Sequence, residues 1–468
     1  MRNAVKQVFD EYTESILEEL EQSKDFKAIN PAQDFFQDKL FYAVQNNSDY
    51  YLLSSDRRII KFDDLEENGY IIRNGIIPST CNFRIKSAAE FIKGKSVNIL
   101  DCFNSINSQL QKYIYFDDSR IYNILTIWTI GTYFYRAFRY YPYIWLNADK
   151  GSGKTRVMEV LRPLAFNAIM AVNSTEASIF RFVDTDCATL FIDEFEKLKK
   201  DNQQGIITLL NSGFNFEGSV VRTEKAMDTY KPKTYSAFSP KMFAGIADIS
   251  DVLMDRCIKV KLLKKPKDTV VQSYKLDDIT MEQNKTLRDE LYICALEHAG
   301  NIKKIYDSNK ISMPDVLSDR EQDIWEVLFS IAKYIDETNK TNIIDSLNGF
   351  AIDSSKERAK INIEKNDSYK LISILVDVLP TLTPKKIQDK TKYYDSDELF
   401  GKFKKTEEFG WLKSKNYLTT MLSNKFHINN DRVTISGKKT RLYAIPDNHI
   451  RMLVERYNLN EVVDVSNF

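Results

Sequence analysis

The stretch from Tyr143 to Thr155, YIWLNADKGSGKT, constrains the fold more than any other part of the chain. It begins with an apolar run that predicts a buried strand, continues through a glycine-containing loop, and passes into a helical pattern of apolar residues at Lys154. Strand, glycine-rich loop and helix in this order are typical of a phosphate-binding loop, because the glycines let backbone N–H groups turn toward phosphate oxygens. The helix N-terminus adds positive potential at the same place. The stretch therefore predicts an α/β fold with a nucleotide site at this loop.

Residue types within the loop indicate how it would hold a nucleotide. Lys154 would contact the β and γ phosphates of ATP, and the hydroxyl of Thr155 would bind Mg²⁺. The other predicted nucleotide-binding residues are those of the loop itself: Asp149, Lys150, Gly151, Ser152 and Gly153. Ala148 stands where a first glycine is more usual, but Gly151 and Gly153 can still supply the turn. A chance Gly/Ser loop before a helix is the alternative.

A second apolar run, Thr189–Leu190–Phe191–Ile192, ends in the adjacent carboxylates Asp193 and Glu194. A buried strand would deliver this pair to the carboxyl edge of the sheet, where ligands of open α/β sheets bind. Asp193 is the predicted second Mg²⁺ residue, acting through water, and Glu194 would orient the attacking water. The pattern alone is common, but it lies about forty residues beyond a phosphate-binding loop, which makes it specific.

Length and composition limit the remaining possibilities. At 468 residues the chain should hold roughly three domains. The sequence contains no run of 18 apolar residues, so it predicts no membrane-spanning helix. The acidic N-terminus does not resemble a signal peptide. Five cysteines without CxxC spacing and three scattered histidines support neither a disulfide framework nor a zinc site. We therefore expect a cytoplasmic protein without a membrane partner.

Changes in residue pattern predict five regions. Residues 1–95 begin with a helical pattern over 1–22 and continue with short strands over 38–75, which predicts a small α+β domain. Residues 96–140 predict buried helices that form a collar, and their aromatic side chains are better explained by core packing than by base stacking. Residues 141–265 form the nucleotide core. Residues 266–365 predict a helical lid that ends in a polar linker over 354–367, and residues 366–468 form the last domain.

The nucleotide core contains an unusual insertion over residues 218–238. Two predicted strands, 218–222 and 234–238, flank a polar loop of eleven residues, Thr223 to Lys233, that carries Lys225, Lys231 and Lys233. The next core strand is predicted at 241–246. A long polar hairpin suits projection into solvent or a pore, so these lysines are candidate contacts for a DNA backbone.

The C-terminal region is the most basic part of a chain whose net charge is zero: residues 381–445 carry 14 basic and 7 acidic side chains. Three helices followed by two strands predict a winged helix, with a recognition helix and a basic wing tip. The candidate DNA contacts are Lys413, Lys415, Arg432, Lys438 and Lys439. A packing module with a solvated basic face is the alternative.

Taken together, GSGKT, FIDE, the inserted hairpin, LMDRC and SDREQDIWEVL resemble AAA+ ATPases of the MCM-like helicase group. The nearest resemblance is to replication initiator helicases of staphylococcal pathogenicity islands and to the Cch-type proteins of methicillin-resistance cassettes. It covers roughly residues 120–457. The resemblance implies a parallel sheet with helices on both faces, a helical lid and a winged helix. It also implies that Arg256 is an arginine finger, Arg320 the second sensor and Asp248 the first sensor, where Asn is more usual.

These observations predict an ATP- and Mg²⁺-dependent DNA helicase that also initiates replication. The resemblance implies a hexameric ring that moves pore hairpins along single-stranded DNA and recognises duplex DNA at an origin, with host replication proteins as further partners. An arginine finger that faces the neighbouring subunit also requires an oligomer. The alternative is an AAA+ ATPase that binds DNA as an initiator, or remodels proteins, without processive unwinding.

Overall fold

The computed structural model describes residues 26–148, 151–171, 175–196, 204–226, 229–246, 249–308, 311–412, 414–457 and 459. The chain divides into two compact units, the first made of residues 1–312 and 322–347, the second of residues 313–321 and 348–468. The helix expected over residues 1–22 lies outside the described residues. None of the helices in the described part is both long enough and apolar enough to cross a membrane. The five predicted domain boundaries stay predictions.

The first unit contains a five-stranded parallel sheet in the order β13-β7-β12-β9-β8. Its strands are buried apolar runs, as expected for parallel strands covered by crossover helices. They are β7 (Tyr143–Ala148), β8 (Ile169–Met170), β9 (Leu190–Ile192), β12 (Lys241–Gly245) and β13 (Cys257–Leu262). The α/β fold and the strand before the glycine-containing loop are confirmed. In place of the strand expected at 171–173, β8 ends at Met170, and residues 172–174 lie outside the described part.

Each connection between these strands contains a helix, which is how parallel strands are joined. The connecting helices are α5 (Lys154–Leu161), α6 (Glu176–Thr185), α8 (Gln204–Ser212) and α9 (Asp251–Met254). Because all five strands run in the same direction, their carboxyl ends share one edge of the sheet and their amino ends share the other. The loop after β7 and the carboxylates after β9 therefore lie at the same edge.

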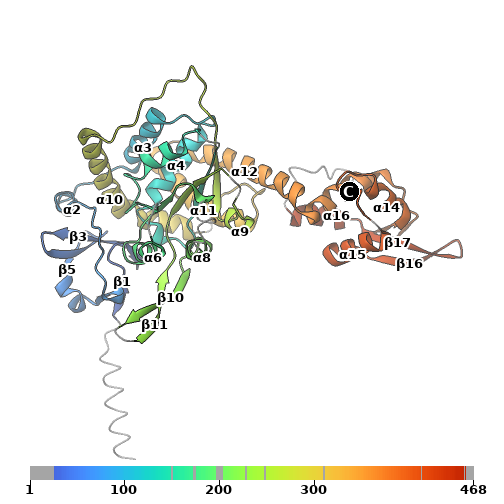
Figure 1. Cartoon of the computed structure of the whole chain (residues 1–468), viewed down its shortest axis with the longest axis horizontal. Helices are drawn as coiled ribbons and strands as arrows, with labels where there is room; N and C mark the ends of the chain where they lie inside the picture. Colours follow the sequence, from blue (N-terminus) through green and yellow to red (C-terminus); the bar gives the residue numbers. More distant parts are fainter. Residues whose placement is uncertain are drawn as a thin grey trace, which may run out of the picture. The chain divides into compact units, whose positions relative to one another are not determined.

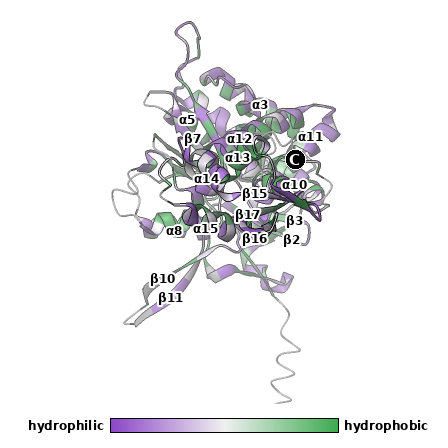
Figure 2. Cartoon of the chain, turned by 90° about the vertical axis from the view of Figure 1, so that its right-hand side faces the viewer, coloured by the Kyte–Doolittle hydropathy of each residue, from purple (hydrophilic) through white to green (hydrophobic). Residues whose placement is uncertain are grey.

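The insertion between α8 and β12 is a two-stranded antiparallel hairpin of β10 (Ser219–Ala226) and β11 (Thr229–Ser236). It extends away from the body of its unit in both views (Figures 1 and 2). The expected eleven-residue loop is wrong: its residues continue both strands, and only positions 227 and 228, which lie outside the described part, separate them. A two-stranded ribbon has no buried face, so its strands need not alternate between apolar and polar residues. Thr and Tyr residues, which favour β-strands although they are polar, can therefore continue the pairing of β10 with β11.

The N-terminal region contains the short strands that its sequence predicts. An antiparallel sheet runs in the order β2-β3-β4-β5, and β1 pairs with β6 in parallel. The elements are β1 (Lys27–Ile29), β2 (Asp34–Phe36), β3 (Lys39–Asn46), β4 (Asp49–Ser54), β5 (Ile59–Lys61), β6 (Tyr70–Ile72), α2 (Ile85–Ile92) and three 3₁₀ turns at Phe62–Asp64, Glu66–Asn68 and Arg73–Gly75.

Buried polar contacts join this region to helix α6 and to the segment that follows α4 (Arg120–Gly131). The side-chain amide of Asn30 donates to the backbone oxygen of Asp184 at 2.7 Å, and Gln33 donates to the backbone oxygen of Thr132 at 3.1 Å. Arg136 forms a buried ion pair with Asp34 at 3.4 Å. Breaking such contacts would leave buried polar groups unpaired, so they hold the N-terminal strands firmly against these elements.

Helices α3 (Ile99–Tyr113) and α4 (Arg120–Gly131) and a 3₁₀ turn at Tyr135–Ala137 occupy the expected collar region. The aromatic residues Trp128, Tyr133 and Phe134 are fully buried there, so core packing accounts for them, as predicted. Helix α10 (Asp278–Asp307) follows the sheet, and α11 (Asp319–Asn339) and α12 (Ile343–Lys365) each contribute residues to both units.

The second unit is a mixed α/β body with its own apolar core. Its sheet is antiparallel in the order β14-β15-β17-β16. The elements are α13 (Asp367–Val378), a 3₁₀ turn at Leu379–Thr381, β14 (Lys386–Gln388), β15 (Thr391–Asp395), α14 (Ser396–Lys404), α15 (Lys415–Phe426), β16 (Asn430–Ile435), β17 (Lys438–Pro446) and α16 (His449–Arg456). The three expected helices and two expected strands are present, whereas β14, β15 and α16 were not predicted.

One interpretation of the sequence fails in this region. The segment 354–367, expected to be a polar linker, is helical as far as Lys365 at the end of α12. The linker was predicted from its charged residues alone. Its Lys, Glu, Arg and Ala residues have high helix propensity, and it contains neither Gly nor Pro, so the segment can continue the helix.

Candidate nucleotide-binding site

The loop after β7 has the backbone conformation that phosphate binding requires. Gly151 and Gly153 have φ values of +80° and +96°, in the left-handed region that favours glycine. A Cβ added at either position would meet no other atom of the described residues within 4 Å, so the loop opens onto free space. Gly153 is the N-cap of α5, whose first residue is the half-buried Lys154. Asp149 and Lys150 lie outside the described residues.

The most informative contact of the site joins the two predicted magnesium residues. The hydroxyl of Thr155, at the start of α5, donates to a carboxylate oxygen of Asp193, just beyond β9, at 2.8 Å. The two residues are 38 positions apart in the chain and are brought together by the shared carboxyl edge of the sheet. Hydroxyl and carboxylate oxygens are hard ligands that suit Mg²⁺.

A magnesium ion at this place would take its remaining ligands from elsewhere. Among the described residues there is no cluster of three or more side chains that could hold a metal. Mg²⁺ usually binds proteins through one or two side chains and completes its octahedron with water and substrate phosphates. The pair Thr155 and Asp193 therefore fits a Mg²⁺–nucleotide complex better than a metal site made of protein alone.

Glu194 follows Asp193 in a backbone conformation that is uncommon for a residue with a side chain. Its φ is +52°, its side chain is exposed, and its backbone N–H donates to Asp193 Oδ1 at 2.8 Å. Positive φ at a non-glycine residue costs free energy and is concentrated at functional sites. The conformation turns the chain immediately after the strand, beside the predicted magnesium pair.

Sequence reasoning missed a third carboxylate near this edge. Glu196 Oε2 is buried and accepts no hydrogen bond from the described residues. A Cβ added to Gly245, at the end of β12, would lie 2.6 Å from Glu196 Oε2 and 2.6 Å from the ring of Trp145. Gly245 therefore leaves the space that Glu196 occupies. The only signal in the sequence was its position two residues beyond the carboxylate pair.

Arg256 lies at the opposite edge of the same sheet. It directly precedes β13, and its backbone oxygen accepts a hydrogen bond from the backbone N–H of Tyr143 at 3.0 Å, at the start of β7. The length of β7 separates this point from the phosphate-binding loop, roughly 17 Å at about 3.3 Å per residue. Arg256 is thus a strand length from the glycine loop that follows β7 in its own chain.

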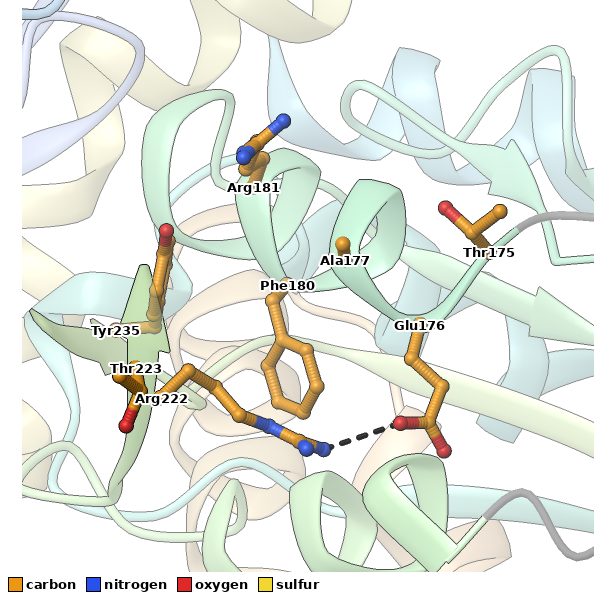
Figure 3. Close-up of a pocket in the computed structure, with 8 residues that line it drawn as sticks. All are labelled: Thr175, Glu176, Ala177, Phe180, Arg181, Arg222, Thr223 and Tyr235. Carbon is orange, nitrogen blue, oxygen red and sulfur yellow. Dashed lines mark hydrogen bonds and ion pairs between the residues drawn. The ribbon is translucent and has the colours of Figure 1, made fainter. Parts of the chain in front are cut away.

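The root of the hairpin also lies at this amino edge and is fixed to α6. Arg222 of β10 pairs with Glu176 at 3.2 Å and lies over the ring of Phe180 at 4.6 Å (Figure 3). Glu176 also accepts a hydrogen bond from the backbone N–H of Gly205 at 2.7 Å, which adds α8 to the contact. A cavity of about 690 Å³ lies beside these residues.

Lys241, at the start of β12, forms hydrogen bonds with the segments that precede β10 and follow β11. It is fully buried, and its ammonium group donates to the backbone oxygens of Gly213, Ala237 and Ser239 at 3.3, 2.9 and 3.0 Å. Three acceptors match the three N–H donors of lysine. Burial lowers the pKa of Lys241 well below its usual value. A single lysine at the start of a buried strand, KMFAG, was the only sequence signal.

Backbone register places the predicted DNA-contacting lysines along the hairpin. Lys225 pairs with Tyr230, one pair before the last of the ladder, so its backbone is close to the tip. Lys231 is exposed, and Lys233 lies over the ring of Tyr235 at 4.9 Å. The expected order of importance, with Lys225 first, stays a prediction.

The second unit holds the remaining candidates. Lys438 and Lys439 are exposed at the start of β17, directly after a two-residue turn in which Ser436 and Gly437 both have positive φ. Lys415, the first residue of α15, pairs with Asp397 at 2.6 Å. Arg432, another predicted DNA contact, is exposed on β16, and Arg320, the predicted second sensor, lies in the first turn of α11. The predicted DNA contact Lys413 and the predicted first sensor Asp248 lie outside the described residues.

Comparison with known proteins gives low similarity. SCCmec type IV Cch, described as an active helicase, is 9% identical with a TM-score of 0.34, and the match covers 88% of this chain and 79% of that one. Two apo structures of the NrS-1 C-terminal region are 14% and 12% identical, each with a TM-score of 0.35, and cover 85% and 87% of this chain and 94% and 96% of theirs. Neither a protein-family model nor a curated protein matches. Similarity at this level establishes neither fold nor function.

Proposed function

We propose that the chain is an ATP-dependent DNA helicase that initiates replication and works as a hexameric ring. The observation that carries the proposal is the 2.8 Å hydrogen bond between Thr155 and Asp193 at the carboxyl edge of a parallel sheet. It joins a glycine loop, a helix N-terminus and a carboxylate strand in one site, which is what a nucleoside triphosphate needs.

Each residue of this edge has a distinct task in ATP hydrolysis. Lys154 binds the β and γ phosphates, and Thr155 and Asp193 hold Mg²⁺, which when bound neutralises charge on the phosphate oxygens. Glu194 positions and polarises the attacking water. Asp248, three residues beyond Gly245 in the sequence, is assigned here as the first sensor of the γ-phosphate.

Arg256 serves a neighbouring subunit. Because it lies roughly one strand length, about 17 Å, from its own phosphate loop, it cannot reach its own γ-phosphate. Its guanidinium completes the site of the next chain, where positive charge stabilises the transition state. A residue that acts only in trans requires a head-to-tail assembly, and a closed ring is the arrangement in which every site is complete. Arg320 acts as second sensor.

The hairpin transmits hydrolysis to DNA. Its root is attached to α6 and α8 through Arg222 and Glu176, so a movement of these helices moves the hairpin. Lys225 near the tip holds the phosphates of a single strand, and Lys231 and Lys233 contribute less. The second unit, a winged helix in this proposal, holds duplex origin DNA through α15 and the wing of Lys438 and Lys439.

Strand displacement on a forked duplex tests this proposal. We expect the chain to separate the strands only when ATP and Mg²⁺ are present, and Glu194→Gln to bind the fork without separating it. DNA-stimulated ATPase activity without strand separation would instead assign the chain to the initiators or protein-remodelling ATPases. Absence of ATPase activity would refute both assignments.

A further inference from the structure

A second cavity in the first unit is unrelated to the phosphate-binding loop. It has a volume of about 390 Å³ and lies between the segment Thr80–Asn82, the end of α5 with the chain leading to β8, and the first half of α10. Since α5 begins at the nucleotide loop and the cavity is at its other end, the cavity is at the amino side of the sheet. Its volume is within the range of small-molecule sites.

The charges around this cavity favour an anion. Arg162, Lys285 and Arg288 line it, and none of the described residues that line it is acidic. In the described part of the chain Arg162 and Arg288 form no salt bridge, and Lys285 has only a 3.8 Å contact with the exposed Glu282. Guanidinium groups present several donors in one plane, which matches the oxygens of a phosphate.

Two residues that line the cavity each have a buried side-chain atom without a partner within the described chain. Arg288 Nε is a buried donor without an acceptor, and Asn284 Oδ1 is a buried acceptor without a donor. Asn284 is 3% exposed, so solvent reaches little of its side chain. Unpaired buried polar atoms are costly, and both of these belong to residues of the cavity wall.

The walls of the cavity are held in place before any ligand binds. Asn167 donates to the backbone oxygen of Asp186 at 2.8 Å and accepts from Asn82 at 2.9 Å. Asp186 accepts from the backbone N–H of Ser79 at 2.6 Å, which fixes the segment that leads to Asn82. Asn284 donates to the hydroxyl of Tyr274 at 3.2 Å. A preorganised wall reduces the entropy lost on binding.

We propose that this cavity binds a nucleotide unit, with its phosphate at Arg162, Lys285 and Arg288 and its base against the carboxamides. Carboxamides of asparagine match the donor and acceptor edges of bases. Pro163, Ala165 and Ile169 supply an apolar wall for the base or sugar. The unit is either a free nucleoside monophosphate or the phosphorylated end of a DNA strand, since both present the same chemistry.

Binding measurements on the full chain carrying Lys154→Ala test this inference independently of ATP hydrolysis. The probes are AMP, which lacks the β and γ phosphates that Lys154 would hold, and a 5′-phosphorylated tetrathymidylate. We expect calorimetry to detect binding of at least one probe, and the added pair Arg162→Gln and Arg288→Gln to weaken it at least tenfold. AMP binding alone indicates a free nucleotide, and tetrathymidylate binding alone indicates a strand end.

Two further variants keep the test independent of folding. Lys285→Glu reverses an exposed charge at the cavity mouth and should also weaken binding by about tenfold. Lys303→Gln, on the same helix α10 but away from the cavity, should leave the affinity unchanged. The inference is overturned if neither probe binds, or if Lys285→Glu and the arginine pair both bind as tightly as the parent chain.

Discussion

The two edges of the parallel sheet carry different kinds of chemistry. At the carboxyl edge, Thr155 and Asp193 are in direct contact, and the loop of Gly151 and Gly153 opens onto free space beside them. At the amino edge, Arg256 precedes β13, and Lys241 and Arg222 fix the root of the hairpin. Residues of the first edge can meet on one nucleotide, whereas those of the second are a strand length away from it.

In the proposed function, this difference separates the residues that hydrolyse ATP from the residues that couple hydrolysis to other molecules. Under that proposal, groups at the carboxyl edge would serve the chain's own ATP. Groups at the amino edge would act on another molecule: the next subunit for Arg256 and DNA for the hairpin. Damage to the carboxyl edge should therefore abolish ATP turnover outright. Damage to the amino edge should spare nucleotide binding and disturb cooperation between subunits or coupling to DNA.

The largest effect is expected from the carboxyl edge. Lys154→Ala should reduce ATP hydrolysis to background because the β and γ phosphates lose their main cation. Glu194→Gln should bind ATP as the parent does but fail to hydrolyse it. Steady-state phosphate release and equilibrium binding measure the two effects, with Lys303→Ala as the matched lysine control. Near-parental turnover in both variants would remove the nucleotide assignment.

A smaller effect, confined to coupling, is expected at the hairpin tip. Lys225→Ala should lower the number of base pairs separated per ATP hydrolysed by roughly tenfold, because the hairpin loses a cation that would hold the phosphates of the strand. ATP binding should not change. Lys231→Ala, a matched variant in the same hairpin, should have a weaker effect. A parental ratio in Lys225→Ala would exclude this lysine from the coupling mechanism.

Removal of the wing lysines should affect DNA binding alone. Lys438→Gln with Lys439→Gln should reduce the slope of log affinity against log salt by about 0.9 for each DNA phosphate that the protein no longer neutralises. Basal ATPase activity should be preserved. Lys86→Gln with Lys93→Gln removes the same charge elsewhere and serves as the control. An unchanged salt slope would favour a solvated basic face over a DNA-binding wing.

The smallest effect concerns stability at the amino edge. Because burial lowers the pKa of Lys241 in the folded chain, the unfolded chain binds this proton more tightly. The lysine's contribution to stability therefore rises with pH up to the unfolded pKa of about 10.4. Lys241→Met removes the titration, so the unfolding free energy of the parent minus that of the variant should increase between pH 7 and pH 10 in urea titrations. A difference independent of pH would contradict this.

The contrast between the edges also explains what the sequence could predict. Gly153, Lys154 and Asp193 belong to short motifs whose function depends on local order along the chain, so the carboxyl edge was predictable. Lys241 depends on carbonyl groups of Gly213, Ala237 and Ser239, and Arg222 depends on Glu176, 46 positions away. Such partners leave no local pattern. The hairpin strands are longer than predicted, because the polar residues of 223–233 were interpreted as a loop. Polar residues argue against a strand only when one face of that strand must be buried.

Action between subunits is the claim on which this comparison depends, and a mixing experiment tests it directly. Arg256→Ala should bind ATP normally and hydrolyse it on the order of 10³-fold more slowly, as expected for a missing arginine finger. Lys154→Ala retains the arginine but has no working nucleotide loop. Under conditions where subunits exchange, a mixture of the two should hydrolyse ATP faster than the sum of the separate proteins, because some sites combine an intact loop with a neighbour's Arg256. A mixture that never exceeds this sum would contradict action in trans.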